Sequence, residues 1–184
     1  LFYLPLAGSA FKKVYYDNLL GRATSRLVKA ENLVVAYETV DLETSPRFTH
    51  VMTMTGNDLK KLQLNGTYKN IEIGDASPDI DINEAKEKMD ELQGISPSMT
   101  DYDEYTVLEM HVNLELSDED NYGFAVPYVV TILEEQGEIL SIRRNWEAED
   151  ELFNKKEYFV HYKFLPGLGF YGFGLIHMIG GLTK

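Results

Sequence analysis

Alternating apolar runs joined by very short turns constrain the fold of this chain most. Residues 105–116 read YTVLEMHVNLEL, and residues 124–146 hold two further alternating runs that meet at Glu135, Gln136 and Gly137. Such a short connection can join only antiparallel strands, because parallel strands need a crossover of a dozen residues or more. The pattern therefore predicts antiparallel hairpins and not a repeating β-α-β chain.

Other segments extend the same pattern. One helix is expected to begin at Thr55 to Asn57 and to stop at Gly66, with Leu59, Leu62 and Leu64 apolar, and a second is expected over 81–93. The fold class is thus α+β, mostly antiparallel hairpins with about nine strands and two or three helices. The further strands are expected at 1–7, 9–17, 26–40 with a break at Glu31-Asn32, 47–55, 71–74 and 157–164.

The segment LFYLPLAGSAFKKVYYD is interpreted as a hairpin. Two alternating runs meet at Gly8 and Ser9, which is a short turn signal of the kind that sets strand register. Lys12 and Lys13 on the second run are interpreted as the solvated face of an edge strand.

A glycine-rich stretch near the end reads YFVHYKFLPGLGFYGFGLIHMIGGLTK, with G-x-G-x-x-G spacing after a strand-like run and before a helix-like run. A dinucleotide site also needs an acidic residue about 20 positions further on, and the sequence offers none. We expect instead a sharp structural elbow, in which glycines allow positive φ and close backbone approach, and Phe170, Tyr171 and Phe173 anchor the corner by burial. The elbow residues are Pro166, Gly167, Gly169, Phe170, Tyr171 and Gly172.

Charge and composition exclude several classes of function. The chain has 17 basic and 30 acidic residues, a formal net charge of −13, which disfavours tight general binding to nucleic acid. It has no cysteine, so disulfides, thiolate zinc sites and cysteine nucleophiles are excluded. No apolar run approaches the ~20 residues of a membrane helix, and no membrane partner is expected. Because Leu1 is not an initiator and the last residues look helical without a cap, we expect a fragment of a longer protein.

An acidic segment offers a weak calcium pattern. Asp79, Asp81 and Asn83 stand at loop positions 1, 3 and 5, and Asp90 stands at position 12. Glu84 occupies the position where the loop needs glycine for its bend. Calcium binding is therefore an alternative, and a helix cap at Asp81 or Asn83 is the favoured interpretation.

A second acidic loop, SDEDNYG, has Asp118, Asp120 and Gly123 at positions 1, 3 and 6, but Val129 falls at position 12, so a solvated hairpin loop is favoured.

The histidines occur singly, with no spacing that puts two ligands on one helix face. The sequence also lacks G-x-S-x-G and a phosphate loop. We expect no catalytic, cofactor or metal residues, and no enzyme. The four histidines are His50, His111, His161 and His177.

Three blocks of the sequence resemble the portal protein, the head-to-tail connector of tailed bacteriophages. They are LFYLPLAGSAFKKVYYD, LETSPRFTHVMTMTGNDLKKLQLNGTYKN and VHYKFLPGLGFYGFGLIHMIGGL. The likeness spans most of the chain and is loose over about 75–117. Its specificity lies in the order and spacing of the blocks.

The resemblance implies a structural component of the virion, assembled in the host cytoplasm. Portal subunits form a ring, typically a dodecamer, at one capsid vertex. A separate terminase packages double-stranded DNA through the channel, and the DNA later leaves by the same route without sequence-specific binding. The implied partners are other portal subunits, terminase, capsid and tail-adaptor proteins.

The resemblance also implies a division of the chain. Residues 1–165 would be a wing-like α+β domain, and residues 166–184 would be the elbow and the start of a stem helix. Two alternatives stay open: a non-enzymatic α+β binding module, and a nucleotide-binding enzyme fragment that uses Gly167, Gly169 and Gly172.

Overall fold

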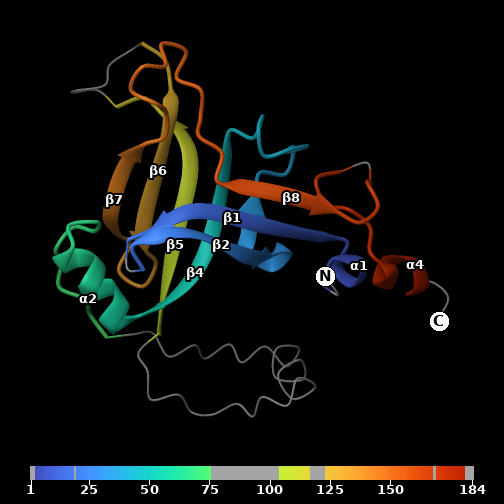
Figure 1. The fold of residues 1–184 in the computed structure, drawn as a ribbon, viewed down its shortest axis with the longest axis horizontal. Coiled ribbons are helices and arrows are strands. Elements are labelled where there is room, and N and C mark those ends of the chain that lie inside the picture. The colour runs from blue at the N-terminus through green and yellow to red at the C-terminus, as the bar shows by residue number, and fades with distance from the viewer. Residues whose placement is uncertain (1–2, 19, 76–103, 117–122, 168, 181–184) are drawn as a thin grey trace.

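The computed structural model describes residues 3–18, 20–75, 104–116, 123–167 and 169–180. Within these ranges the chain is an α+β protein whose eight strands form two antiparallel sheets (Figure 1). The predicted fold class is confirmed. The large sheet is a meander of five strands, and the small sheet joins the beginning of the described chain to its end.

The small sheet has the order β2-β1-β8, with β1 (Ser9–Asp17) in the centre, β2 (Arg22–Lys29) on one edge and β8 (Phe159–Lys163) on the other. The true hairpin is β1 with β2, and its turn includes Gly21 at a φ of 62°. The predicted last strand is confirmed, and its pairing with β1 brings residues about 150 positions apart side by side.

The large sheet has the order β3-β4-β5-β6-β7. The predicted strand 47–55 and the predicted turn at 135–137 are confirmed, and Gly137 in that turn has a φ of 66°. Alternation and turn chemistry were sufficient for these two features, but the strand predicted to run to Val40 ends at Val35. Its strands are β3 (Leu33–Val35), β4 (Arg47–Thr55), β5 (Glu104–Leu114), β6 (Val126–Leu133) and β7 (Glu138–Arg144).

The break predicted at Glu31-Asn32 is the short helix η1 (Ala30–Asn32), which carries the chain from one sheet to the other. The predicted helix near residue 56 is α2 (Gly56–Leu64), and the Thr55 hydroxyl caps it by accepting from the Asp58 amide at 3.2 Å. Leu59 and Leu62 are buried, but Leu64 is exposed.

The predicted strand over residues 1–7 is wrong, because Tyr3–Ala7 form the short helix α1. Pro5 is compatible with a first helical turn, and Gly8 ends the helix with a φ of 81° while its amide donates to the Leu4 carbonyl at 2.8 Å. The run therefore reads as a strand by its alternation, but its proline and glycine are helix boundary residues.

Three further predictions have different outcomes. Residues 71–74 are not a strand, since 69–75 run irregularly beside α2, where Gln63 donates to the Lys69 and Ile71 carbonyls. The predicted helix over 81–93 lies outside the described residues. The helix-like run after the glycines contains α4 (Leu175–Ile179), which lies beside α1 in Figure 1.

One face of the large sheet is covered in two parts. Near α2 the cover is apolar, a cluster in which Leu59 meets Tyr105, Val107 and Leu133. Toward the other end of β4 and β5 the cover is the small sheet. The opposite face packs against Trp146 and Phe153 from the connection between β7 and β8, with Tyr128 beneath them.

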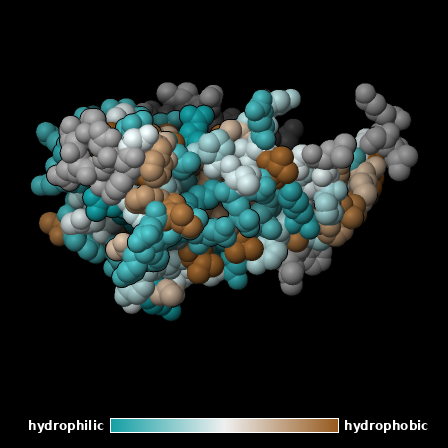
Figure 2. Space-filling view, turned by 90° about the horizontal axis from the view of Figure 1, so that it is seen from above, coloured by the Kyte–Doolittle hydropathy of each residue, from teal (hydrophilic) through white to brown (hydrophobic). Residues whose placement is uncertain are grey.

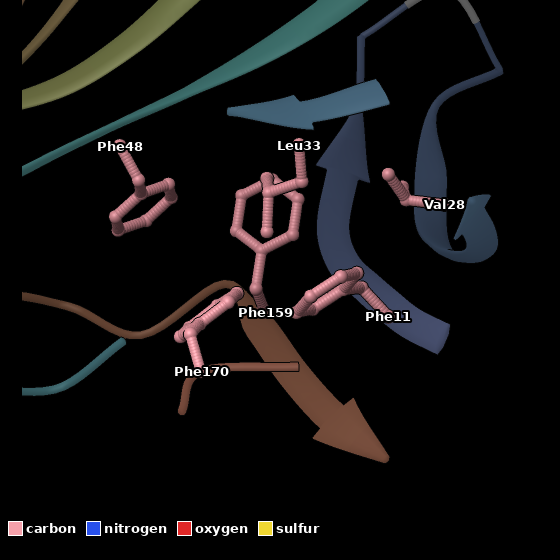
Figure 3. Close-up of a cluster of buried hydrophobic side chains, with 6 residues drawn as sticks. All are labelled: Phe11, Val28, Leu33, Phe48, Phe159 and Phe170. Carbon is pink, nitrogen blue, oxygen red and sulfur yellow. The ribbon is translucent and has the colours of Figure 1, made fainter. Parts of the chain in front are cut away.

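An aromatic cluster lies where the small sheet meets the large one. In Figure 3 the rings of Phe11, Phe159 and Phe170 point toward one another, with Phe48 beside them. Phe48 and Phe159 meet edge to face at 5.5 Å between ring centroids, a favoured geometry for aromatic pairs. This cluster fixes the position of the corner that follows β8.

Candidate functional site

The predicted elbow is a corner folded onto the start of β1. The Gly172 amide donates to the Ser9 hydroxyl at 2.8 Å, and Ser9 is fully buried. His161 lies 3.1 Å from the same hydroxyl through Nε2. One buried serine thus joins β1, β8 and the corner.

Two aromatic residues of the corner anchor it differently. Phe170 is buried, 5.7 Å from the Phe11 ring and 4.7 Å from the His161 ring between centroids. Tyr171 remains exposed, but its hydroxyl donates to the Leu33 carbonyl at 3.0 Å. The corner therefore contacts both the small sheet and the first strand of the large one.

Close backbone approach is what the corner requires of its glycines. A Cβ on Gly172 would lie 2.6 Å from the Gly8 carbonyl oxygen and 2.9 Å from that of Leu165. A Cβ on Gly174 would lie only 2.1 Å from the Leu6 carbonyl oxygen. Real Cβ atoms do not approach oxygen so closely, so both positions depend on glycine.

The expectation of positive φ is wrong for all three motif glycines, because none of Gly167, Gly169 and Gly172 has one. Gly167 instead lies against the Phe173 ring, which a Cβ would meet at 2.8 Å. Gly169 faces open space, so nothing in the corner requires glycine there. Pro166 is exposed.

The corner closes on itself by a two-hydrogen-bond bridge. The Phe173 amide donates to the Leu165 carbonyl at 2.8 Å, and the Leu165 amide donates back at 3.3 Å. Beyond the bridge α4 lies beside α1, and apolar residues gather at this end of the molecule in Figure 2. Ile176 and Ile179 are both more than half exposed.

The strand before the glycines is not the strand of a dinucleotide site. β8 pairs only with β1 among the described strands, and it pairs antiparallel at the edge of a three-stranded sheet. The fingerprint requires a parallel strand that leads directly into a long helix, whereas α4 has five residues. The described residues of the corner therefore lack the parallel strand and long helix that would hold a pyrophosphate.

A buried ionic cluster, which sequence reasoning missed, lies between the sheets. Lys13 Nζ donates to Glu109 Oε1 at 2.6 Å, and both residues are less than 10% exposed. His111 Nε2 lies 3.2 Å from the same carboxylate oxygen, and His50 Nδ1 lies 3.9 Å from it. The interpretation of Lys13 as a solvated edge residue is therefore wrong.

Alternation explains the error. Successive side chains of a strand point to opposite faces, so Lys12 is exposed while Lys13 points into the molecule. β1 is also the central strand of its sheet and not an edge. The sequence does hold a local sign that Lys13 is buried, because Lys13 lies on the same face of the strand as the apolar Phe11.

The cluster shifts the pKa values of its members. Burial alone would raise the pKa of Glu109, but the His111 hydrogen bond and the Lys13 ammonium outweigh it and hold that pKa well below its usual range. Burial, with the Lys13 charge, lowers the pKa of His50 to about 4. Burial also lowers the pKa of His111, so its neutral ring donates to the carboxylate through Nε2.

A cavity of about 230 Å³ opens beside this cluster, lined by Lys13, Tyr15, Glu109, Arg143 and Tyr158 among others. Two of its charged groups, Lys13 and Glu109, are already paired with each other across the sheets. Within the described ranges, no three His, Asp or Glu side chains are placed to hold a metal ion.

The remaining sequence candidates are dispersed. His161 lies on β8 beside the corner, where burial and then the Lys163 charge lower its pKa to about 4, and His177 is exposed on α4. Both acidic loop patterns lie largely outside the described residues. Of their members, Gly123 is exposed and Val129 is buried in β6.

Comparisons with known proteins give no family assignment. Neither the scan against protein-family models nor the search of curated proteins finds a match. In the part of the chain that the structure describes, no helix combines the length and the apolar character needed to cross a bilayer.

Proposed function

We propose that this chain is the wing region of a portal protein of a tailed bacteriophage. In this role it is a structural part of a ring at the capsid vertex, and it catalyses no reaction. Double-stranded DNA passes through the ring channel, driven by a separate terminase, and is later ejected.

The observation that carries the proposal is that the three sequence blocks with the resemblance form one contact region. The first contains β1 and the third contains residues 160–163 of β8, and these two strands pair side by side. The second contains Phe48, which belongs to the same buried cluster as Phe11 of the first block and Phe170 of the third. Segments far apart in sequence thus meet around the corner (Figure 3).

The geometry of the corner also favours this role. A wing on a longer ring subunit needs a firm exit at which its orientation is fixed. The Ser9 hydrogen bond, the buried Phe170 ring and the packing of α4 on α1 supply such an exit. The segment from α4 onward would continue as the stem.

The charge fits a channel through which DNA slides. Each phosphate contact releases counterions and adds affinity, which would resist movement of the DNA. A net charge of −13 keeps such contacts few. The wing would thus discourage DNA from binding outside its route.

Size measurement on the full-length protein that contains this chain tests the proposal. Native mass spectrometry and electron microscopy should find a closed ring with a central channel. A protein that stays monomeric under conditions where it is folded would contradict the proposal and favour the α+β binding module.

A further inference from the structure

The outer face of the small sheet, which points away from the large sheet, is apolar and uncovered within the described residues. Strand register places Leu27 and Val160 on either side of Lys12, so the three side chains share this face. Five large residues on the face are exposed by 45 to 64%. They are Val14, Tyr16, Leu27, Val160 and Tyr162.

The residues of the three strands that point to this face include two lysines and no acidic residue. Lys12 and Lys29 point outward, and Asp17, the one acidic residue of these three strands, is buried on the opposite face. Glu31, just beyond β2, lies 3.4 Å from the Lys29 ammonium in an exposed ion pair, so Lys12 is the lysine of this face that forms no ion pair within the described residues. In a chain with 30 acidic residues, strands that present two lysines and no carboxylate outward form a distinct surface. It is suited to a partner that is apolar at its centre and acidic around it.

The chain itself presents a surface of that chemistry. Residues 147–152 read EAEDEL, and Glu147, Glu149 and Glu151 are exposed there. Leu152 is 80% exposed. The Asp150 carboxylate accepts from the Leu152 amide at 2.9 Å and from the Asn154 amide at 2.8 Å, which fixes the loop with its leucine outward.

We propose that the outer face of one copy docks the 147–152 loop of a second copy, head to tail. Leu152 would contact the apolar residues of the outer face, and the loop carboxylates would contact Lys12 and Lys29. The exposure of Leu152 indicates that the loop does not dock within its own chain, and Figure 1 places it in the connection between β7 and β8, away from α1 and α4.

The association is heterologous, because the contact joins two different surfaces of the chain. Repetition of such a contact closes a ring when the rotation between neighbouring copies permits it. The inference therefore rests on the proposed function, for which it names the surfaces between neighbouring wings. Protein is a better occupant than DNA, because five exposed apolar residues accompany only two lysines. A phosphate backbone would leave those apolar residues in water.

Charge reversal in each surface tests the contact. The face variant carries Lys12→Glu with Lys29→Glu, and the loop variant carries Glu149→Lys with Glu151→Lys. In sedimentation at about 50 mM salt, where screening is weak, the parent chain should associate with increasing concentration. Each variant alone should associate on the order of tenfold more weakly. Mixing the two variants should restore association, because each supplies the surface that complements the other.

Matched controls separate this contact from net charge. Lys60→Glu with Lys69→Glu repeats the charge change of the face variant on exposed residues elsewhere, and Glu38→Lys with Glu134→Lys repeats that of the loop variant. Equal effects of variants and controls would overturn the inference. So would a parent chain that does not associate, or a mixture without recovery.

Two further measurements complete the test. Binding of a short DNA duplex that is lost in the face variant would reassign the face to nucleic acid and overturn the inference. Ring formation by the full-length protein is measured separately. If the full-length protein forms rings but the 184-residue chain does not associate, this inference alone is rejected. If the 184-residue chain associates but the full-length protein forms no ring, the proposed function is rejected.

Discussion

Lys13 and Glu109, 96 positions apart in sequence, form a 2.6 Å ion pair that joins the small sheet to the large sheet. Both side chains are about 90% buried, so water screens the pair little. Taking two charges out of water is costly, which makes such a pair a determinant of alignment more than a source of net stability. The aromatic cluster around Phe11 supplies the apolar burial beside it.

Removing one member of the pair should be strongly destabilising. Lys13→Met leaves the Glu109 carboxylate buried without its cation, and a loss of about 3 to 5 kcal/mol in the free energy of unfolding is expected. Urea titration followed by circular dichroism measures it. The double replacement of Lys13 and Glu109 by methionine should recover most of the loss, because no charge is then left unpaired.

Lys12→Met is the matched control, since Lys12 is the exposed neighbour on the same strand. It should change stability by no more than about 0.5 kcal/mol. Equal losses for the two single variants would show that the ion pair has no special role in joining the sheets.

Stability should fall as pH falls from 6.5 toward 4. In the folded chain burial and Lys13 lower the pKa of His50 to about 4, so between these values the unfolded state binds a proton that the folded state does not. The lowered pKa of His111 acts in the same direction. The contribution of His50 is on the order of 2 to 3 kcal/mol. Below pH 4.5 the lowered pKa of Glu109 adds a further loss of stability.

Urea titrations at several pH values test this linkage. His50→Gln should flatten the pH dependence between 6.5 and 4, because glutamine does not titrate. His177→Gln, which changes an exposed histidine on α4, is the comparison variant for the removal of a histidine as such. If stability depends on pH as steeply in His50→Gln as in the parent, His50 does not contribute to the loss of stability at low pH.

Sequence could predict the strands of the large sheet because their signals are local. The boundaries of β4 follow from its own β-branched and threonine residues, and the β6-β7 turn follows from Gly137. The site was less predictable. The burial of Lys13 depends on Glu109, whose position relative to β1 no local pattern gives.

The corner shows the same limit. Burial was predicted for Phe170, Tyr171 and Phe173, but only Phe170 is buried, whereas Tyr171 and Phe173 are exposed. Of the two reasons given for glycine, close backbone approach is confirmed and positive φ is wrong. Close approach at Gly172 arises from the Gly8 and Leu165 carbonyls, whereas Gly169 faces open space. Motif spacing alone assigns these two glycines the same importance, and only the packing partners separate them.

Nucleotides should not bind this chain. β8 is an antiparallel edge strand, so the glycines after it do not form the phosphate-binding turn of a parallel sheet. NAD and ATP, each varied up to millimolar concentration, are expected to leave the Tm unchanged in thermal unfolding. A specific ligand raises the Tm with its concentration by mass action, and such a rise would contradict the structural role of the corner.

Replacing Gly172 should loosen the corner, and replacing Gly169 should not. In Gly172→Ala the new Cβ meets two backbone carbonyl oxygens at 2.6 and 2.9 Å, and neither can move without shifting β1 or the bridge at Leu165. A loss of about 1 to 3 kcal/mol is expected, as for other overpacked sites. Thermal unfolding measures the loss, and hydrogen exchange at the residue 172 amide reports the bond to Ser9 directly.

Gly169→Ala is the control, because its Cβ enters open space and its φ is not positive. Its stability and its exchange should match those of the parent within error. In the full-length protein, Gly172→Ala should also reduce ring formation more than Gly169→Ala does, since a displaced corner changes the direction in which α4 leaves the small sheet. Normal rings and unchanged exchange in Gly172→Ala would make the corner an ordinary surface turn, because its tight packing would then govern neither the local structure nor the assembly.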